Sequence, residues 1–564
     1  MGKANEKNFD IKNSKVIKSI NKLDGFLRAE YNTEKNYLDY YAGQETIDKV
    51  NSIKYQVIYG RRGTGKTHLL RALQERLLET KEKYFPVYID LRAYKPMLGN
   101  NDDLYYALIL LQEIIIEILK CVYENLDYIY SEYSIQEQEI IANSKKKKIA
   151  VILEKFNRHF DGDSFTKMGE VAFKINELKK VATSLKLTKM PVFLGEKGID
   201  KESETTDEKV KYISFADISN ALSELLDIID IDRLFCLLDE WSEIPENSQY
   251  ILAELIKRTF ITSKVTVKIA AIPNRTKLLS ENRIGLEDGG DIFGYSLDNR
   301  YIYELYPDNT RAFFNELLFK QLYIINPELY KIFCSDNKSR PVHKFINSFF
   351  ANQALREILI ASSGIPRDFL NIFIASYNSF YNIARYKHIV LADVRNATIE
   401  WYEVDKKKTV DANNNAKILL DKIIKDILIN KKRCHFLIPE KFEKVKELND
   451  LIDLRVVHLR KKGISHKGVK GVIYNVYYLD YACYTSTNLY HNKINTNLLS
   501  EIETIDNFRD IRRISLEDKF FEDFNIEIGD SFKCPKCGKM VDMNHPAYIK
   551  QKICNHCYEK GSVK

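Results

Sequence analysis

The residues best suited to chemistry stand in one short run of the 564-residue chain: Gly60, Arg61, Arg62, Gly63, Thr64, Gly65, Lys66 and Thr67. This run matches the phosphate-loop pattern G-x-x-x-x-G-K-[ST] at every position. Glycines in such a loop let backbone N–H groups surround phosphate oxygens. The lysine reaches the β- and γ-phosphates, and the threonine hydroxyl ligates Mg²⁺. The run therefore predicts a site for ATP with Mg²⁺.

The flanking sequence supports this interpretation. The apolar stretch YQVIY before the run predicts a buried strand, and KTHLLRALQERLLE, which starts at Lys66, has the spacing of a helix. The positive end of that helix dipole would face the phosphates, with His68 in its first turn beside the nucleotide. A glycine-rich turn without a ligand is the alternative, and the order strand, loop and helix argues against it.

A second motif supplies carboxylates. In RLFCLLDEWSEIP, residues 233–245, an apolar strand ends at Asp239 and Glu240. An aspartate at the end of a buried strand can hold the Mg²⁺ shell, and the neighbouring glutamate can polarise the attacking water. The alternative is a strand that merely ends in an acidic turn.

Further strands complete an α/β pattern. YFPVYIDLRAY follows the first helix, and KVTVKIAAIPNRT carries Asn274 at its end. Strands that alternate with helices predict a parallel sheet flanked by helices. Residues 98–212 are helical and charged, and we interpret them as an insertion into this core.

Five stretches in this order carry a family resemblance: GRRGTGKT, PVYIDLRAY, LLDEW, AAIPN and GIPRDFL. The set resembles the AAA+ P-loop ATPases, and within them the origin-recognition-type (ORC/CDC6-like) replication initiators and their bacterial relatives. The resemblance covers about residues 40–400 and departs from the family in the long insertion. It implies an ATPase with a helical lid that assembles with other subunits. Relatives of this type occur in bacterial mobile elements and phage defence.

The resemblance also implies roles for single residues. Asn274 corresponds to the polar residue that orients the attacking water, and Arg367 to the lid arginine that contacts the γ-phosphate. A salt bridge at a helix start is the alternative for Arg367. An arginine finger from a neighbouring subunit would be Arg300 by position, with Arg283 as the second choice.

The charge of the chain is concentrated in one segment. Residues 411–500 hold 16 Lys and Arg against 9 Asp and Glu, a net charge of +7 that equals that of the whole chain. Helices followed by an alternating hairpin resemble a winged-helix module, which relatives carry after the lid. The hairpin tip offers cations for phosphate contacts: Arg460, Lys461, Lys462, His466, Lys467 and Lys470. DNA is the expected partner, whereas a solvated hairpin or a protein-binding module is the alternative.

Four cysteines near the C-terminus have metal-site spacing. Cys534, Cys537, Cys554 and Cys557 form C-x₂-C-x₁₆-C-x₂-C, which is typical of a structural Zn²⁺ site and resembles a zinc ribbon. His545 and His556 are alternative ligands. The segment is too short to hold a core alone, so the metal would supply its folding energy.

These features predict a multidomain protein in which ATP binding and hydrolysis control DNA binding. The alternative is a scaffold ATPase whose ATP-gated assembly recruits an effector protein. We expect a cytoplasmic location, because no continuous apolar core opens the chain and the apolar stretch 104–123 contains charges. The expected divisions are an N-terminal extension 1–45, a core 46–305, a lid 306–405, a winged-helix-like module 406–495, a linker 496–528 and a zinc ribbon 529–564.

Overall fold

A computed structural model describes residues 10–27, 36–80, 82–94, 103–130, 133–160, 215–334, 344–382, 386–465, 471–485 and 514–560. The chain divides into two compact units. The sheet unit comprises residues 34–60 and 66–297, and the lid unit comprises residues 1–33, 61–65 and 298–564. Each unit is described by itself below.

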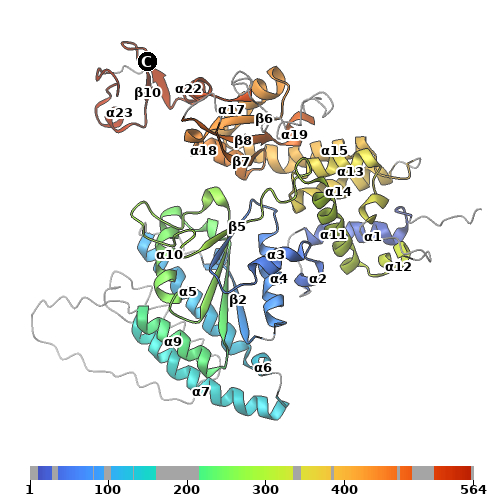
Figure 1. Cartoon of the computed structure of the whole chain (residues 1–564), viewed down its shortest axis with the longest axis vertical. Helices are drawn as coiled ribbons and strands as arrows, with labels where there is room; N and C mark the ends of the chain where they lie inside the picture. The colour runs from blue at the N-terminus through green and yellow to red at the C-terminus, as the bar shows by residue number, and fades with distance from the viewer. Residues whose placement is uncertain are drawn as a thin grey trace, which may run out of the picture. The chain divides into compact units, whose positions relative to one another are not determined.

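The sheet unit is built on a five-stranded parallel sheet with the order β2-β3-β4-β1-β5 (Figure 1). The strands are β1 (Gln56–Tyr59), β2 (Tyr84–Asp90), β3 (Arg233–Asp239), β4 (Val265–Ala271) and β5 (Phe293–Ser296). In β3 the side chains alternate between two buried clusters: Cys236 and Leu238 belong to one, Phe235 and Leu237 to the other. Burial on both faces explains why this strand is a continuous apolar run. The expected α/β core is confirmed.

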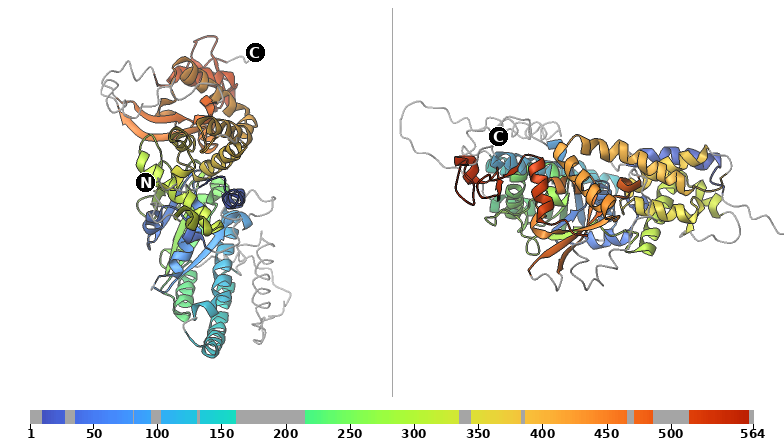
Figure 2. Two further views of the ribbon diagram at one scale, coloured as in Figure 1. Left: turned by 90° about the vertical axis from the view of Figure 1, so that its right-hand side faces the viewer. Right: turned by 90° about the horizontal axis from the view of Figure 1, so that it is seen from above.

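Helices cover both faces of the sheet. Residues of α5 (Asp103–Glu124), α9 (Phe215–Ile228) and α10 (Glu246–Phe260) join the larger cluster, and residues of α3 (Gln44–Val50) and α4 (Lys66–Leu78) join the other. In Figures 1 and 2, α7 (Ile135–Phe160) runs beside α9. The short helices α2 and α6 span Tyr37–Tyr40 and Leu126–Ile129.

The expected insertion is partly described: α5, α6 and α7 account for residues before 161, and residues 161–214 lie outside the described part of the chain. Among the helices that the structure describes, none combines the length and apolarity needed to cross a bilayer.

The lid unit begins with a helical bundle. Its helices are α1 (Ser14–Leu23), α11 (Pro307–Ile325), α12 (Glu328–Cys334), α13 (Asn352–Ala361), α14 (Pro366–Tyr381) and α15 (Leu391–Trp401). The N-terminal helix α1 packs on α11 and α14, and Tyr377 donates a hydrogen bond to the carbonyl of Ile11 at 2.5 Å. Part of the expected N-terminal extension is therefore an element of the bundle.

The chain leaves α15 through a π-helical turn (Tyr402–Lys407) and enters a smaller module. Its helices are α16 (Lys408–Asp411), α17 (Asn414–Ile423), α18 (Lys446–Asp453) and α19 (Tyr481–Thr485). Its antiparallel sheet has the order β6-β8-β7, with β6 (His435–Pro439), β7 (Val457–Ser465) and β8 (Ile473–Leu479). The predicted hairpin is thus formed by β7 and β8.

Part of the expected linker also belongs to this module. Leu516 donates a backbone hydrogen bond to Leu437 of β6 at 2.8 Å, and α22 (Asp518–Glu527) packs on α17. The rings of Phe442 and Phe521 stack with centroids 4.0 Å apart. The chain ends in β9 (Ser531–Lys533), β10 (Met540–Asp542) and α23 (Pro546–Gln551).

Candidate functional site: a phosphate loop, paired carboxylates and a cysteine cluster

The sheet unit holds the ends of the phosphate loop. Gly60 directly follows β1, and its N–H donates to the carbonyl of Ala271 at 3.1 Å, which fixes the exit of the strand. Lys66 opens α4, and its Nζ donates to the carbonyl of Gly60 at 2.8 Å. The loop is therefore closed at its base, with the lysine and the neighbouring Thr67 at the helix N-terminus, where an anion is favoured.

Asp239 is fully buried at the end of β3. Its Oδ2 accepts a hydrogen bond from the Tyr88 hydroxyl at 2.8 Å, and its Oδ1 accepts one from the Glu240 N–H at 2.8 Å. Burial, followed by the charge of Asp239, raises the pKa of Tyr88, so the phenol stays protonated and keeps donating. The carboxylate orientation is thereby fixed.

Glu240 occupies an unusual backbone conformation. Its φ of 56° and ψ of 36° lie in the left-handed region, which costs about 1 kcal/mol or more for a residue with a side chain. Its side chain lies 3.7 Å from the Arg92 guanidinium, which also holds Asp90 at 2.6 Å. Burial and the charge of Asp239 raise the pKa of Glu240, while Lys66 and Arg92 oppose this shift. A strained, desolvated carboxylate beside a buried aspartate is typical of a reactive group.

Asn274 is exposed in a turn that follows β4. Because β4 lies between β3 and β1, the turn stands at the same edge of the sheet as Asp239 and Gly60. His68 lies in the first turn of α4. Its ring is tilted by 35° against the ring of Tyr40, with the centroids 4.4 Å apart, and its Nε2 is 2.9 Å from the carbonyl oxygen of Tyr37. Within the sheet unit, Lys66, Asp239, Glu240 and Asn274 therefore all lie at the carboxyl ends of the strands. The side chain of His68 contacts tyrosines instead.

The middle of the loop, Arg61–Gly65, belongs to the lid unit. Gly63 has a φ of +86°, and a Cβ at this position would lie 2.9 Å from the Cβ of Arg367. The Arg367 N–H donates to the Gly63 carbonyl at 3.3 Å. The predicted lid arginine therefore lies against the phosphate loop, at the start of α14, and the glycine allows this close approach. Arg62 is exposed, and Gly65 has a φ of +93° with open space around it.

Arg61 differs from its neighbours because its side chain is buried. It is 4% exposed, its Nε donates to Asp298 at 2.9 Å, and its guanidinium contacts the ring of His458 on β7. The role of Arg61 as a residue of the nucleotide-binding loop stays a prediction, and its side chain is engaged by Asp298 and His458. The arginine is held by the lid unit.

A network of buried charged side chains adjoins His458, whose Nε2 lies 2.8 Å from Asp480. The Nζ of Lys406, 2% exposed, lies 2.9 Å from Asp480 and 3.3 Å from Asp368. Arg455 pairs with both Asp368 and Asp405. Burial opposes the charged form of these carboxylates, but the cations hold the pKa of Asp368 and of Asp480 below the ordinary value. Removal of one partner from such a network leaves an uncompensated charge.

The predicted basic tip divides into three parts. Arg460 is 7% exposed and donates to Asn299 at 3.2 Å, so its burial removes it from the candidate phosphate contacts. Lys461 and Lys462 are exposed, and Lys462 pairs with Glu443. The remaining predicted residues, His466, Lys467 and Lys470, lie outside the described residues.

The two arginine-finger candidates occupy different surroundings. Arg300 is half-buried in the lid unit, with its guanidinium 5.6 Å from the ring centroid of Tyr301. Arg283 is exposed in the sheet unit and has a φ of 59°. Neither observation distinguishes them, and both stay predictions.

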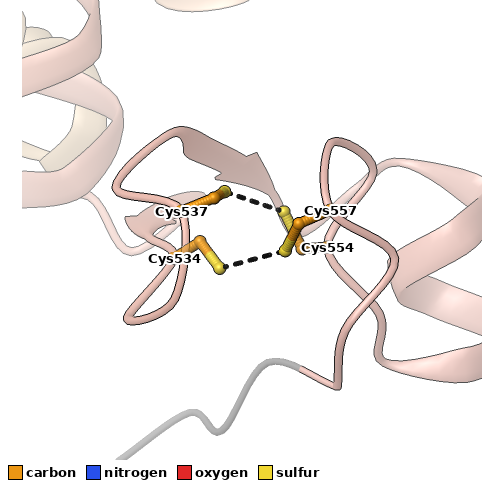
Figure 3. A group of neighbouring side chains, drawn as sticks. All are labelled: Cys534, Cys537, Cys554 and Cys557. Atoms are coloured by element: carbon orange, nitrogen blue, oxygen red, sulfur yellow. Dashed lines mark hydrogen bonds between the residues drawn. The ribbon is translucent and has the colours of Figure 1, made fainter.

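The four predicted cysteines converge from two turns (Figure 3). Their sulfur atoms all lie within 4.8 Å of one another, with 3.7 Å between Cys534 and Cys557 and 3.8 Å between Cys537 and Cys554. Tetrahedral Zn²⁺ with Zn–S bonds of about 2.3 Å requires sulfurs about 3.8 Å apart. Backbone N–H groups lower the pKa of Cys534 to about 7, which favours the thiolate that binds metal. A backbone hydrogen bond also acts to lower the pKa of Cys557, but burial and the neighbouring cysteines raise it to about 12. The donor set therefore fits Zn²⁺.

The sequence motifs do not identify several residues that contact the predicted site residues. Arg92 lies in the PVYIDLRAY stretch and Asp368 directly follows Arg367, so both were adjacent to recognised motifs. His458 offered a weaker signal: it is a polar residue between valine and leucine in a strand whose neighbours are apolar.

The match to a family model confirms the family resemblance. The chain matches the ORC-CDC6-like family over residues 25–420. No curated protein matches the chain. Among solved structures, two variants of RuvB from Thermotoga maritima align with 11% and 12% identity and TM-scores of 0.27 and 0.26. The alignments cover 91% and 93% of this chain and 98% and 97% of the RuvB chains. Because the family match spans more than half of the 564 residues, the chain belongs to the ORC-CDC6-like family of AAA+ ATPases.

Proposed function

We propose that this protein binds and hydrolyses ATP with Mg²⁺ and couples its nucleotide state to DNA binding. One observation supports ATP binding and hydrolysis most strongly: Lys66, Asp239 and Asn274 lie at the carboxyl edge of one parallel sheet. Open α/β sheets bind their ligands at this edge. Glu240, strained and partly desolvated beside Asp239, adds the group that a hydrolase needs.

The chemistry of the donors supports the choice of ligand. The hydroxyl of Thr67 and the carboxylate of Asp239 are the hard oxygen ligands that Mg²⁺ prefers. The metal would neutralise charge that develops on the phosphates. Lys66 would hold the β- and γ-phosphates, and Glu240 would accept the proton of the attacking water while Asn274 orients it. Arg367, which lies against Gly63, would contact the γ-phosphate.

DNA as the partner rests on the small module of the lid unit. Its order of helix, strand, helix and hairpin resembles a winged helix, and exposed lysines stand toward the end of β7. Phosphate contacts by such lysines give affinity that falls with salt.

We expect the double variant Lys461→Gln/Lys462→Gln to weaken binding of duplex DNA and to lower the salt slope by about 2, one unit per removed charge. The measurement is fluorescence anisotropy of labelled duplex DNA between low and physiological salt. Lys18→Gln/Lys22→Gln on α1 is the matched control, because both lysines are exposed and lie outside the module. An unchanged slope in the hairpin variant would refute the DNA contact at this strand.

The scaffold alternative also has an observation in its favour. Arg460 is buried and Lys462 is paired with Glu443, so the hairpin presents less free positive charge than its sequence indicates. A protein that fails to bind DNA in the anisotropy experiment but changes its mass in light scattering when ATP is added would support ATP-gated assembly instead.

A further inference from the structure

The starting observation is the anchoring of Arg61 within the lid unit. Both its backbone N–H, at 3.3 Å, and its Nε, at 2.9 Å, donate to the same oxygen of Asp298. Its guanidinium also contacts Nδ1 of His458. A buried arginine with this set of partners has a single orientation, and the backbone of the loop at this residue is fixed with it.

His458 is fully buried, and its two ring nitrogens have distinct partners. Nε2 lies 2.8 Å from Oδ2 of Asp480, which as a carboxylate can only accept, so Nε2 carries the proton. Nδ1 is then the acceptor that receives a hydrogen bond from Arg61. Burial, in addition to the charge of Arg61, lowers the pKa of His458 and keeps the ring neutral. Asp480 is itself fixed by Lys406 at 2.9 Å.

The carbonyl of Arg61 shapes the loop that follows. It accepts the N–H of Thr64 at 3.3 Å and the Thr64 hydroxyl at 2.9 Å, which closes the turn across residues 61–64. The N–H groups of this turn are the ones that a phosphate loop presents to its anion. A shift of Arg61 would therefore change the shape of the turn.

We infer that His458, on a strand of the hairpin module, is a positioning residue of the phosphate loop and acts through Arg61. The inference rests on the proposed binding of ATP and adds to it a physical connection between the loop and β7. Because coupling between two sites is reciprocal, a nucleotide in the loop stabilises the Arg61–His458 contact as much as the contact favours the nucleotide.

Two amide substitutions separate the two hydrogen bonds of the ring. In His458→Asn the side-chain oxygen takes the place of Nδ1 and keeps the contact with Arg61, whereas the bond to Asp480 is lost. In His458→Gln the side-chain nitrogen takes the place of Nε2 and keeps the hydrogen bond to Asp480. The hydrogen bond from Arg61 to Nδ1 is lost, while Arg61 keeps its bonds to Asp298. His435→Gln is the matched control, because His435 is also buried and lies on β6 of the same sheet.

The experiment measures the ATPase KM and kcat of the full chain, with thermal unfolding of each variant. We expect His458→Gln to raise KM for ATP about tenfold with kcat within about twofold, since one charge-assisted hydrogen bond is lost. His458→Asn should keep KM within about twofold of the wild type, although it also loses one hydrogen bond and unfolds at a lower temperature. His435→Gln should lower the unfolding temperature without raising KM.

Equal KM values for wild type and His458→Gln would overturn the inference, and so would equal increases in both His458 variants. If His458→Gln does not fold, Arg61→Met replaces it; this variant loses the side-chain contacts with both His458 and Asp298 and should raise KM at least as much. An unchanged KM in Arg61→Met would then overturn the inference. With both variants folded, the double variant should have the KM of Arg61→Met alone, because His458 acts on the loop only through Arg61. A wild-type protein without ATP turnover or ATP binding would refute the proposed function, which is a different result.

Discussion

Glu240→Gln is expected to bind ATP with Mg²⁺ as tightly as the wild type and to lower the turnover rate by about 10²–10³-fold. The amide preserves the size of the side chain and its left-handed backbone but cannot accept a proton from water. Nucleotide that enters the site should therefore remain as ATP. The measurement is single-turnover hydrolysis, with the bound nucleotide identified by chromatography after rapid gel filtration.

Glu243→Gln is the matched control, because Glu243 is an acidic residue of the same turn that is not proposed to touch water. Its turnover should stay within about twofold of the wild type. The raised pKa of Glu240 adds a pH test: the base form is lost as pH falls through that pKa, so turnover should decline at a higher pH than an ordinary glutamate would give. Full activity in Glu240→Gln would exclude this residue as the base.

We expect the four-cysteine cluster to bind Zn²⁺, and removal of this metal to unfold the predicted C-terminal ribbon. The buried part of its core is small, formed by Cys534, Val541, Tyr548 and Cys554, with Cys557 packed against it. Zn²⁺ binding by four thiolates supplies on the order of 10–16 kcal/mol, far more than this apolar core can. Cys537→Ser should therefore lose the metal and the protection of ribbon amides from hydrogen exchange, while exchange in the sheet unit stays unchanged.

Zinc content by atomic emission checks this expectation, with about one Zn²⁺ per chain in the wild type. Cys121→Ser is the control, since Cys121 lies on α5, away from the cluster in sequence and in the other unit. A ribbon that keeps its protection after chelation, or a wild-type protein without zinc, would contradict the structural role of the metal.

The local motifs allowed much of this fold to be predicted. A phosphate loop depends on residues that are adjacent in the chain, so Gly60, Lys66 and Thr67 could be recognised with their strand and helix. The apolar run before Asp239 could likewise be recognised as a strand buried on both faces. The cysteine pairs carried their own spacing, and the structure brings all four together.

The buried charges could not be predicted in the same way. In a sequence, Arg61 and Arg460 have the charge of surface residues, and their interior partners are far away along the chain. His458 and Arg460 are both buried against Tyr478 of β8: the ring centroids of His458 and Tyr478 are 6.1 Å apart, and the Arg460 guanidinium lies 5.0 Å from the Tyr478 ring centroid. The register of β7 shifts between Leu459 and Lys461, so simple strand alternation does not predict this arrangement. Grouping the hairpin cations by charge alone did not separate the buried Arg460 from the exposed lysines that follow it. Only the packing of Asp298, Asn299 and Asp480 around them shows where they belong.

Binding of a triphosphate at the loop that contains Lys66 underlies the whole proposed function. Calorimetric titration of the protein with a non-hydrolysable ATP analogue and Mg²⁺ is the most direct test of this binding. We expect saturable binding with one site per wild-type chain. In Lys66→Ala, loss of the charged hydrogen bonds to phosphate should weaken binding by about a hundredfold or more. A wild-type chain that binds no nucleotide, or a Lys66→Ala chain that binds it equally well, would show that this loop is not a nucleotide site.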